Sequence, residues 1–175
     1  LVRRSLKLVK NVLLLSRLKM KEPELQPIDL ERVLQNTLDD IQGIYSTRKL
    51  DLTADIESGL VVKAEPIVEE IFFNLLQNGV KFQDNEVPVI SIRARSEDRE
   101  VVVEVEDHGF GITDDHKEKL FKRFSPSGIG SQSGIGLSLV KELINRYSGR
   151  IEVEDRIEGD HSKGSRFIVH LPLSQ

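Results

Sequence analysis

The sequence predicts an α+β fold of two layers, in which helices cover one face of a mixed, mostly antiparallel sheet, preceded by one separate helix. Apolar residues recur with a helical period in four segments, at residues 1–20, 29–45, 66–82 and 134–147. Apolar and polar residues alternate in strand-like segments at 49–56, 89–95, 101–105 and near the C-terminus. Only a short polar turn separates the second of these strands from the third, which predicts an antiparallel hairpin.

Size and composition narrow the function before any motif is considered. A chain of 175 residues has room for one full hydrophobic core and a short extra element. The net charge of −4 argues against a nucleic-acid partner, and the absence of cysteine excludes disulfides and thiolate chemistry. No apolar run approaches the roughly 18 residues that span a bilayer, and no signal peptide is evident. We therefore expect this chain to be a cytoplasmic fragment of a longer protein. The sequence leaves open whether the full-length protein is anchored in a membrane.

The first helix, expected over residues 1–21, has an apolar seam and a basic face. The basic face is interpreted as a solvated helix surface. We expect the seam to pack on a second helix, either from another chain or from sequence outside this one. Residues 22–28 contain two prolines and are expected to form a stiff linker to a domain at 29–175. The seam is made of Val2, Leu6, Val9 and Leu13, widened by Leu8, Val12 and Leu15.

The first half of that domain carries clear local signals. Asp29 is placed to cap the helix at 29–45, whose apolar residues share one face. Alternation at 49–56 predicts a half-buried strand. Pro66 stands where a helix favours its first residue, which predicts that the helix at 66–82 begins there.

The second half is expected to alternate between strands and helices. Thr113 is placed to cap a short helix after the hairpin, and the Ser-, Gly- and Pro-rich segment 125–133 is expected to be a mobile loop. Gly149 is placed to end the helix at 134–147. Two strands then finish the chain, and the loop between them is expected to hold Gly159 and Gly164.

A polar stripe runs along the otherwise apolar helix at 66–82. Glu70, Asn74, Asn78 and Lys81 follow one another at spacings of four, four and three, which places them on one helix face. Buried amides and charges need partners, and two carboxamides with one ammonium suit an anionic ligand that carries a metal ion. The alternatives are a water-filled groove or a hydrogen bond to a neighbouring loop.

Two glycine-containing segments could form the other walls of such a site. Asp107 stands at a strand end with Gly109 and Gly111, where a carboxylate can accept a hydrogen bond and glycines permit close approach. An ordinary Asx-type turn explains the same residues. Gly134 and Gly136 begin a helix, whose unpaired N–H groups attract anions, although glycine there also permits close helix packing.

Several familiar sites are missing from the sequence. No third glycine completes a dinucleotide-binding pattern after Gly111, and no glycine-rich run ends in Gly-Lys-Ser/Thr. The four histidines show no paired metal-ligand spacing and are interpreted as structural or solvent-exposed. No Ser/His/Asp order typical of a hydrolase stands out.

In combination, these segments resemble the catalytic, ATP-binding domain of sensor histidine kinases, within the superfamily that includes gyrase, Hsp90 and MutL. The match covers about residue 25 to the end, and four boxes in the right order make it highly specific. The resemblance implies a Bergerat-type ATP-binding fold, and residues 1–21 resemble the C-terminal part of a dimerisation helix. Residues 74–82 resemble the N box, 107–112 the G1 box, 120–124 the F box and 134–141 the G2 box.

The resemblance also implies roles for single residues, with ATP and Mg²⁺ as cofactors. Asn78 would ligate Mg²⁺, and Asn74 would support the metal and the phosphates. Lys81 would contact phosphate, and Asp107 would accept a hydrogen bond from the adenine amine. Arg123 is the best-placed basic group for the γ-phosphate, so Asn74, Lys81 and Arg123 form the expected catalytic set. The other expected nucleotide contacts are Phe82, Gly109, Gly111, Ile112, Phe124, Gly134, Ile135, Gly136 and Leu137.

The function implied by the resemblance is transfer of the γ-phosphoryl group of ATP to a histidine, and from there to a response regulator receiver domain. Such kinases act as homodimers through their dimerisation helices. Asn74 favours transfer over hydrolysis, because ATP-hydrolysing relatives carry a glutamate there and an amide cannot act as a base. The alternatives are another ATPase or serine kinase of the superfamily, or a non-catalytic nucleotide-sensing module.

Three departures from the family pattern bear on this interpretation. His108 stands where the family usually has asparagine. The expected ATP lid at 125–133, anchored by Phe121 and Phe124, is short and carries no Lys or Arg. No histidine lies in the first helix, so the phosphoacceptor must be outside this sequence.

Overall fold

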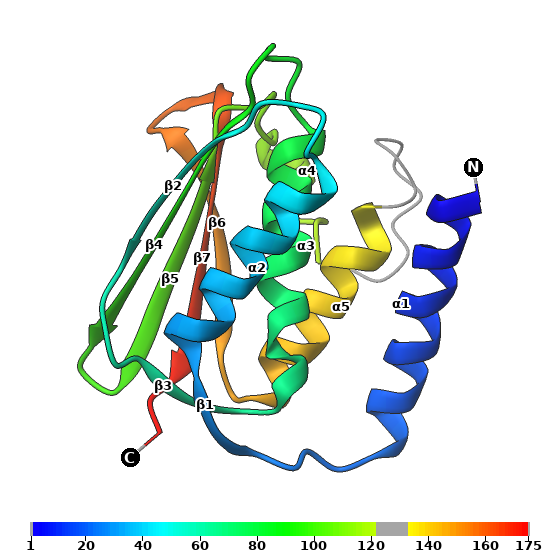
Figure 1. Cartoon of the computed structure of the whole chain (residues 1–175), viewed down its shortest axis with the longest axis vertical. Helices are drawn as coiled ribbons and strands as arrows, with labels where there is room; N and C mark the ends of the chain where they lie inside the picture. Colours follow the sequence, from blue (N-terminus) through cyan, green and yellow to red (C-terminus); the bar gives the residue numbers. More distant parts are fainter. Residues whose placement is uncertain (1, 122–132, 175) are drawn as a thin grey trace.

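The computed structural model describes residues 2–121 and 133–174, with side chains from residue 9 onward and, after the gap, from residue 134 onward. A five-stranded sheet forms one layer, and helices cover one of its faces (Figure 1). The prediction of an α+β two-layer fold with a mixed, mostly antiparallel sheet is therefore confirmed.

The strand order in the sheet is β2-β4-β5-β7-β6. β2 pairs in parallel with β4, and all other pairs in this sheet are antiparallel. The predicted hairpin is present, with Ile90 opposite Asp107 and Glu97 opposite Glu100. The strands are β2 (Asp51–Ile56), β4 (Val89–Glu97), β5 (Glu100–Asp107), β6 (Arg150–Ile157) and β7 (Asp160–Pro172).

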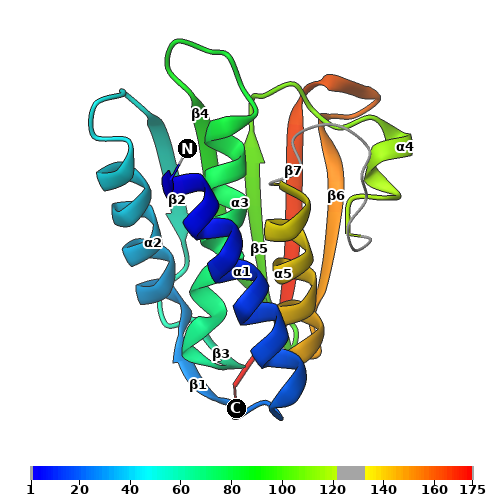
Figure 2. The same ribbon diagram turned by 90° about the vertical axis from the view of Figure 1, so that its right-hand side faces the viewer.

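The longer helices lie on the same side of this sheet (Figure 2). α3 and α5 pack directly on the strands, and α2 packs beside α3. Asp29 caps α2 as predicted, because its carboxylate accepts a hydrogen bond from the Arg32 N–H at 3.1 Å. The helices are α1 (Val2–Met20), α2 (Leu30–Ile44), α3 (Glu69–Lys81), the short α4 (Asp114–Lys117) and α5 (Ser133–Arg146), with a 3-10 turn η1 (Pro66–Val68) before α3.

The core lies between the sheet and the inner helices. Alternate residues of each central strand point inward, as their sequence alternation predicts, and are buried. Their partners are the apolar faces of α3 and α5, which explains why those helices carry so few charged residues. The buried strand residues are Ile90, Ile92, Ala94, Val101, Val103, Val105, Phe167, Val169 and Leu171, and the helix residues include Ile71, Phe72, Leu75, Leu76, Leu139, Val140, Leu143 and Ile144.

Part of the predicted linker is a strand. Gln26–Asp29 forms β1, which pairs antiparallel with β3 (Val61–Ala64) in a separate two-stranded sheet. Pro27 is tolerated because only one neighbour pairs with this short strand. Residues 21–25 form the connection between α1 and β1. The division of the chain into domains at residue 29 stays a prediction.

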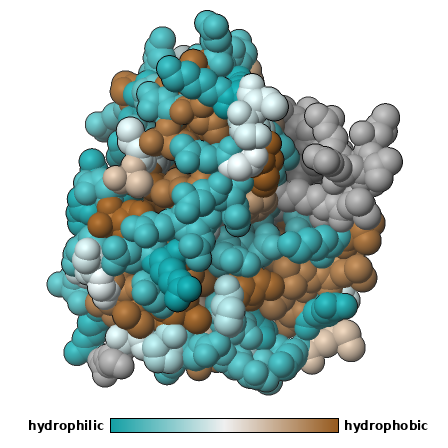
Figure 3. All heavy atoms as spheres, in the orientation of Figure 1, coloured by the Kyte–Doolittle hydropathy of each residue, from teal (hydrophilic) through white to brown (hydrophobic). Residues whose placement is uncertain are grey.

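α1 packs on its own chain, beside α5 (Figures 1 and 2). Asn11 and Leu15 are buried, at 3% and 6% exposure, with Leu14 and Leu18 packed beside them. The expectation that Leu15 belongs with Val9 and Leu13 is wrong, because these two are 53% exposed and lie on another side of the helix. Hydrophobic residues consequently reach the surface along α1 (Figure 3).

One arginine fixes the connection between α1 and the rest of the structure. Arg146, the last residue of α5, forms an ion pair with Glu65 at 2.5 Å. Its Nη1 donates to the carbonyls of Leu18 and Lys21, at 3.0 and 2.7 Å, at the C-terminal end of α1. The side chains of Arg146 and Glu65 are only 9% and 14% exposed, so this is a well-shielded, multiply bonded pair.

Of two glycines near the C-terminus, Gly149 helps to end α5 as predicted, whereas Gly164 does not lie where it was expected. Ser148, with φ of 58°, takes the left-handed conformation after α5, while Gly149 donates its N–H to the Ile144 carbonyl. Gly149 is required because a Cβ there would lie 2.3 Å from the His170 carbonyl oxygen. Gly164 lies within β7 and not in the loop between the last two strands.

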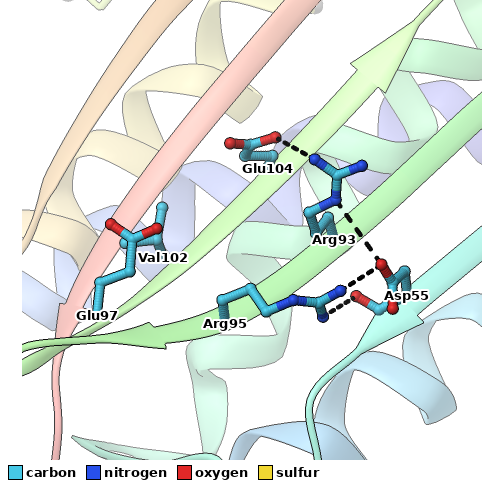
Figure 4. Close-up of a pocket in the computed structure, with 6 residues that line it drawn as sticks. All are labelled: Asp55, Arg93, Arg95, Glu97, Val102 and Glu104. Carbon is cyan, nitrogen blue, oxygen red and sulfur yellow. Dashed lines mark hydrogen bonds and ion pairs between the residues drawn. The ribbon is translucent and has the colours of Figure 1, made fainter.

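The other face of the sheet carries no helix among the described residues and is covered by ion pairs. Arg93 and Arg95 of β4 both pair with Asp55 of β2, and Arg93 also pairs with Glu104 of β5 (Figure 4). The shallow hollow around them, about 450 Å³, is lined almost entirely by charged side chains, most of which already have partners. The charged side chains of this face mostly pair with one another, and this face is not the site that the sequence predicts.

Candidate nucleotide-binding site

The first amide of the α3 polar stripe, Asn74, is held in place by its neighbours. Asn74 is 3% exposed, and its Nδ2 donates to the Glu70 carbonyl at 2.7 Å. The Glu70 side chain points elsewhere and pairs with Lys10 of α1 at 2.7 Å. Asn74 is thus a fixed, neutral hydrogen-bonding group one turn before Asn78.

Asn78 carries an unsatisfied amide. Its Nδ2 is buried and has no hydrogen-bond partner among the residues that the structure describes. Leaving a buried polar atom unpaired costs about 1–3 kcal/mol, which a bound ligand would recover. A half-turn of the amide exchanges the nitrogen and the oxygen, so the same position can present an acceptor oxygen to a cation. Lys81, one turn later, is exposed at the end of α3.

The turn after β5 is an Asx-type turn with a buried carboxylate. Asp107 is 7% exposed, and its Oδ1 accepts hydrogen bonds from the N–H groups of Gly109 at 2.8 Å and Ser165 at 3.4 Å. Burial raises the pKa of this carboxyl above its ordinary value, while those two hydrogen bonds oppose the shift. Both explanations offered for this motif are compatible with the geometry, because only one carboxylate oxygen is held by these backbone groups.

Glycines in and beside this turn allow its backbone to lie directly against the backbones of neighbouring segments. A Cβ on Gly109 would lie 2.3 Å from the Phe82 carbonyl oxygen. Gly111 has φ of 67°, and a Cβ there would lie 1.4 Å from the His161 carbonyl oxygen. Gly164 has φ of 105°, and its Cβ would lie 2.0 Å from the Asp107 carbonyl oxygen. The turn is therefore clamped between the end of α3 and the start of β7, and Ile112 packs beside it against the core.

The start of α5 approaches the α3 stripe. A Cβ on Gly136 would lie 2.8 Å from Asn74 Oδ1, so a larger residue there would require the Asn74 amide to shift. Gly134 faces open space, with nothing described within 4 Å of the place that a Cβ would take. Ile135 is half-buried and Leu137 is 3% exposed, so both support the helix from its core side.

The structure thus brings most of the predicted residues together on three neighbouring elements. Asn74 of α3 meets Gly136 of α5, and a Cβ added to Gly79 of α3 would lie 3.4 Å from the Asp107 Cβ. Phe82 accepts a hydrogen bond from the Phe110 N–H at 3.0 Å, which joins α3 to the Asp107 turn. Arg123, Phe124 and the expected lid lie outside or largely outside the described residues. The contacts of single residues with nucleotide stay predictions.

Sequence reasoning missed three residues of this region. Gly164 was expected only as a loop glycine and Ser165 was given no role, yet both touch Asp107. Gln83, directly after the N box, is 5% exposed and hydrogen-bonded on both sides. A glutamine next to a motif carries no periodic signal, so only the fold reveals its burial.

The side chains of this site fit a metal ion that is coordinated partly by the protein and partly by a bound phosphate-containing molecule. Within the two described ranges, 2–121 and 133–174, no cluster of three or more His, Cys, Asp or Glu side chains could hold a metal by itself. An amide oxygen from Asn78 with phosphate oxygens is a ligand set that Mg²⁺ accepts.

Asp107 makes the stability of the fold depend on pH. Above pH 3.8, its ordinary value, and up to its raised pKa, the folded protein keeps a proton that the unfolded chain releases. Stability from this group is therefore lost as the pH rises through that window. Asp107→Asn should remove this loss and raise the unfolding free energy at pH 7 by about 1 kcal/mol, since no charge is buried.

Urea unfolding at pH 4 to 7 measures this difference. Asp39→Asn, at an exposed position of α2, is the matched control and should leave the pH profile unchanged. Parallel profiles for Asp107→Asn and the unmutated protein would contradict the prediction.

Comparison with known proteins now decides the family. A family model described as histidine kinase-, DNA gyrase B-, and HSP90-like ATPase matches residues 63–175. The chain belongs to this family. The match includes α3, the Asp107 turn and α5, so the resemblance drawn from the four boxes is confirmed.

Two proteins that are similar to this chain along almost its whole length are named as sensor kinases. The sensor protein ChvG of Agrobacterium fabrum is 31% identical over 99% of this chain and 32% of its own length. The sensor histidine kinase YclK of Bacillus subtilis is 27% identical over 98% of this chain and 37% of its own length. The chain thus spans about a third of these relatives and is an ATP-binding catalytic domain of the histidine kinase type.

Solved structures share the fold. Full-length ShkA in complex with AMPPNP has a TM-score of 0.80 and 24% identity, over 97% of this chain and 36% of ShkA. The mycobacterial sensor histidine kinase MprB has a TM-score of 0.72 and 22% identity, over 85% of this chain and 97% of that one. Within the described part of the chain, no helix has the length and apolar character to cross a membrane.

Proposed function

We propose that this chain is the phosphoryl-donating part of a two-component sensor histidine kinase. It would bind Mg²⁺-ATP and transfer the γ-phosphoryl group to a histidine on a dimerisation helix outside this sequence, for relay to a response regulator. The names of ChvG and YclK and the AMPPNP complex of ShkA support this assignment. The full-length protein would act as a homodimer in the cytoplasm.

One observation carries the choice of transfer over hydrolysis. The position where ATP-hydrolysing relatives hold a glutamate is Asn74, whose amide is fixed by the Glu70 carbonyl and by the close approach of Gly136. An amide cannot remove a proton from water. Phosphoryl transfer needs positioning and charge neutralisation more than acid–base chemistry, and the stripe of α3 offers just these.

The proposed roles follow the geometry of the three elements. Asn78 would hold Mg²⁺, which supplies charge neutralisation to the phosphates, and Asn74 would orient the neighbouring ligands. Lys81 and Arg123 would pair with phosphate oxygens. Asp107 would accept a hydrogen bond from the adenine amine. Phe82, Gly109, Gly111, Ile112 and Phe124 would enclose the nucleotide, and Gly134, Ile135, Gly136 and Leu137 would form the helix start that faces the phosphates.

A reconstitution experiment tests the proposal. The protein is mixed with labelled ATP, Mg²⁺ and a separately supplied dimerisation hairpin from a sensor histidine kinase. We expect phosphate on that hairpin that is acid-labile and alkali-stable, as phosphohistidine is. Acid-stable phosphate or rapid release of free phosphate would instead indicate a serine kinase or an ATPase. Nucleotide binding with neither product would indicate a nucleotide-sensing module.

A further inference from the structure

Gln83 is a buried glutamine whose side chain is completely used within the protein. It follows α3 directly and is 5% exposed. Its Nε2 donates to the carbonyls of Gly79 at 2.5 Å and Val89 at 3.4 Å. Its Oε1 accepts from the Val89 N–H and from Asn85 Nδ2, both at 3.0 Å. A carboxamide has two donors and two acceptor sites, so none remains for a ligand.

These bonds join the end of one site element to the start of another. Gly79 lies in the last turns of α3, between Asn78 and Lys81, and its carbonyl is one that the helix end leaves without an α-helical partner. Val89 is the first residue of β4, which pairs with β5 next to Asp107. Gln83 therefore ties the polar stripe of α3 to the end of the β4–β5 pair that carries Asp107.

Asn85 extends the connection to the Asp107 turn itself. Its Nδ2 also donates to the His108 carbonyl at 3.2 Å. The backbone adds two direct links, from the His108 N–H to the Val89 carbonyl at 3.3 Å and from the Phe110 N–H to the Phe82 carbonyl at 3.0 Å. The segment 82–89 thus bridges α3 and the turn, and Gln83 is its buried centre.

We propose that Gln83 is a positioning residue that sets the spacing between the α3 stripe and the Asp107 turn. This inference rests on the proposed function, in which the phosphates meet the stripe and adenine meets the turn. Gln83 touches neither part of the ligand. Gln83 affects the binding of ligands that must contact both elements at once, because only their affinity depends on the spacing. The affinity of a ligand that contacts the turn alone does not depend on it.

Two variants and two ligands test this role. Gln83→Ala removes all four hydrogen bonds. Gln83→Glu keeps the size and the acceptor but loses the donor to Gly79 and Val89. Mg²⁺-ATP reaches both elements, whereas adenosine meets only the Asp107 turn. We expect both variants to bind Mg²⁺-ATP about tenfold more weakly by calorimetry, with the adenosine affinity from NMR titration unchanged within about twofold.

The control is Gln35→Ala, an exposed glutamine of α2, which should bind both ligands like the unmutated protein. Unfolding curves recorded alongside establish that each variant is folded at the titration temperature. Equal weakening of both ligands would assign Gln83 a merely structural role and overturn the inference, as would unchanged binding of Mg²⁺-ATP. Failure of the unmutated protein to bind Mg²⁺-ATP would overturn the proposed function as well, so the two failures are distinguishable.

Discussion

Asn78→Ala is expected to abolish the contribution of Mg²⁺ to nucleotide binding. The variant removes the only side chain proposed to ligate the metal, so ATP affinity should fall by a factor of about ten or more when Mg²⁺ is present and change little when it is absent. Calorimetric titration with ATP, with and without Mg²⁺, measures both quantities. Unchanged Mg²⁺-dependent affinity would contradict the metal role.

This variant should remain folded, which makes the result easy to interpret. Asn78 has a buried Nδ2 without a partner among the described residues, so its replacement removes a polar atom that contributes no hydrogen bond there. Because an unpaired buried polar atom costs about 1–3 kcal/mol, the unfolding free energy is expected to stay the same or to rise by up to that amount. Asn36→Ala, at an exposed position of α2, is the matched control and should leave both the stability and the metal dependence unaltered.

Gly111→Ala should lower the unfolding free energy by about 3 kcal/mol or more. The new Cβ would have to occupy space 1.4 Å from the His161 carbonyl oxygen, and φ of 67° is itself unfavourable for alanine. Because the opposing atom belongs to the backbone, the start of β7 or the Asp107 turn must move. Chemical denaturation measures the loss, and nucleotide binding should weaken in parallel.

Gly159→Ala separates the two causes. Gly159 has a similar φ of 78°, but nothing described lies within 4 Å of its added Cβ. This control should cost only the conformational penalty of about 1–2 kcal/mol. Equal losses for the two variants would show that the close approach to His161 does not matter.

The sequence predicted the elements whose signals are local and periodic. The apolar alternation of β4 and β5 and the helical period of α3 correspond directly to residues that are buried in the core, such as Ile92 and Leu76. The polar stripe was also visible, because Asn74 and Asn78 interrupt an apolar pattern at a helical spacing. The family match confirmed the boxes that these residues form.

Features that depend on distant partners were not predictable in the same way. β1 exists because Gln26–Asp29 meets β3, which lies far along the chain, despite a proline that favours a linker. The side of α1 that packs is set by α5, so the periodicity of Val9, Leu13 and Leu15 alone could not choose it. Gly164 resembled a loop glycine, whereas its true requirement is the carbonyl of Asp107.

The two ends of α5 have different neighbours. Its first turn meets Asn74 through Gly136, and its last residue, Arg146, grips the end of α1 and Glu65. The helix has 14 residues and is therefore about 21 Å long. A rigid rod of that length that tilts by about 3° at one end moves the other by about 1 Å. Because Arg146 bonds to the end of α1, and α1 also packs beside α5, a displacement of α5 next to Asn74 would shift the C-terminal end of α1 as well.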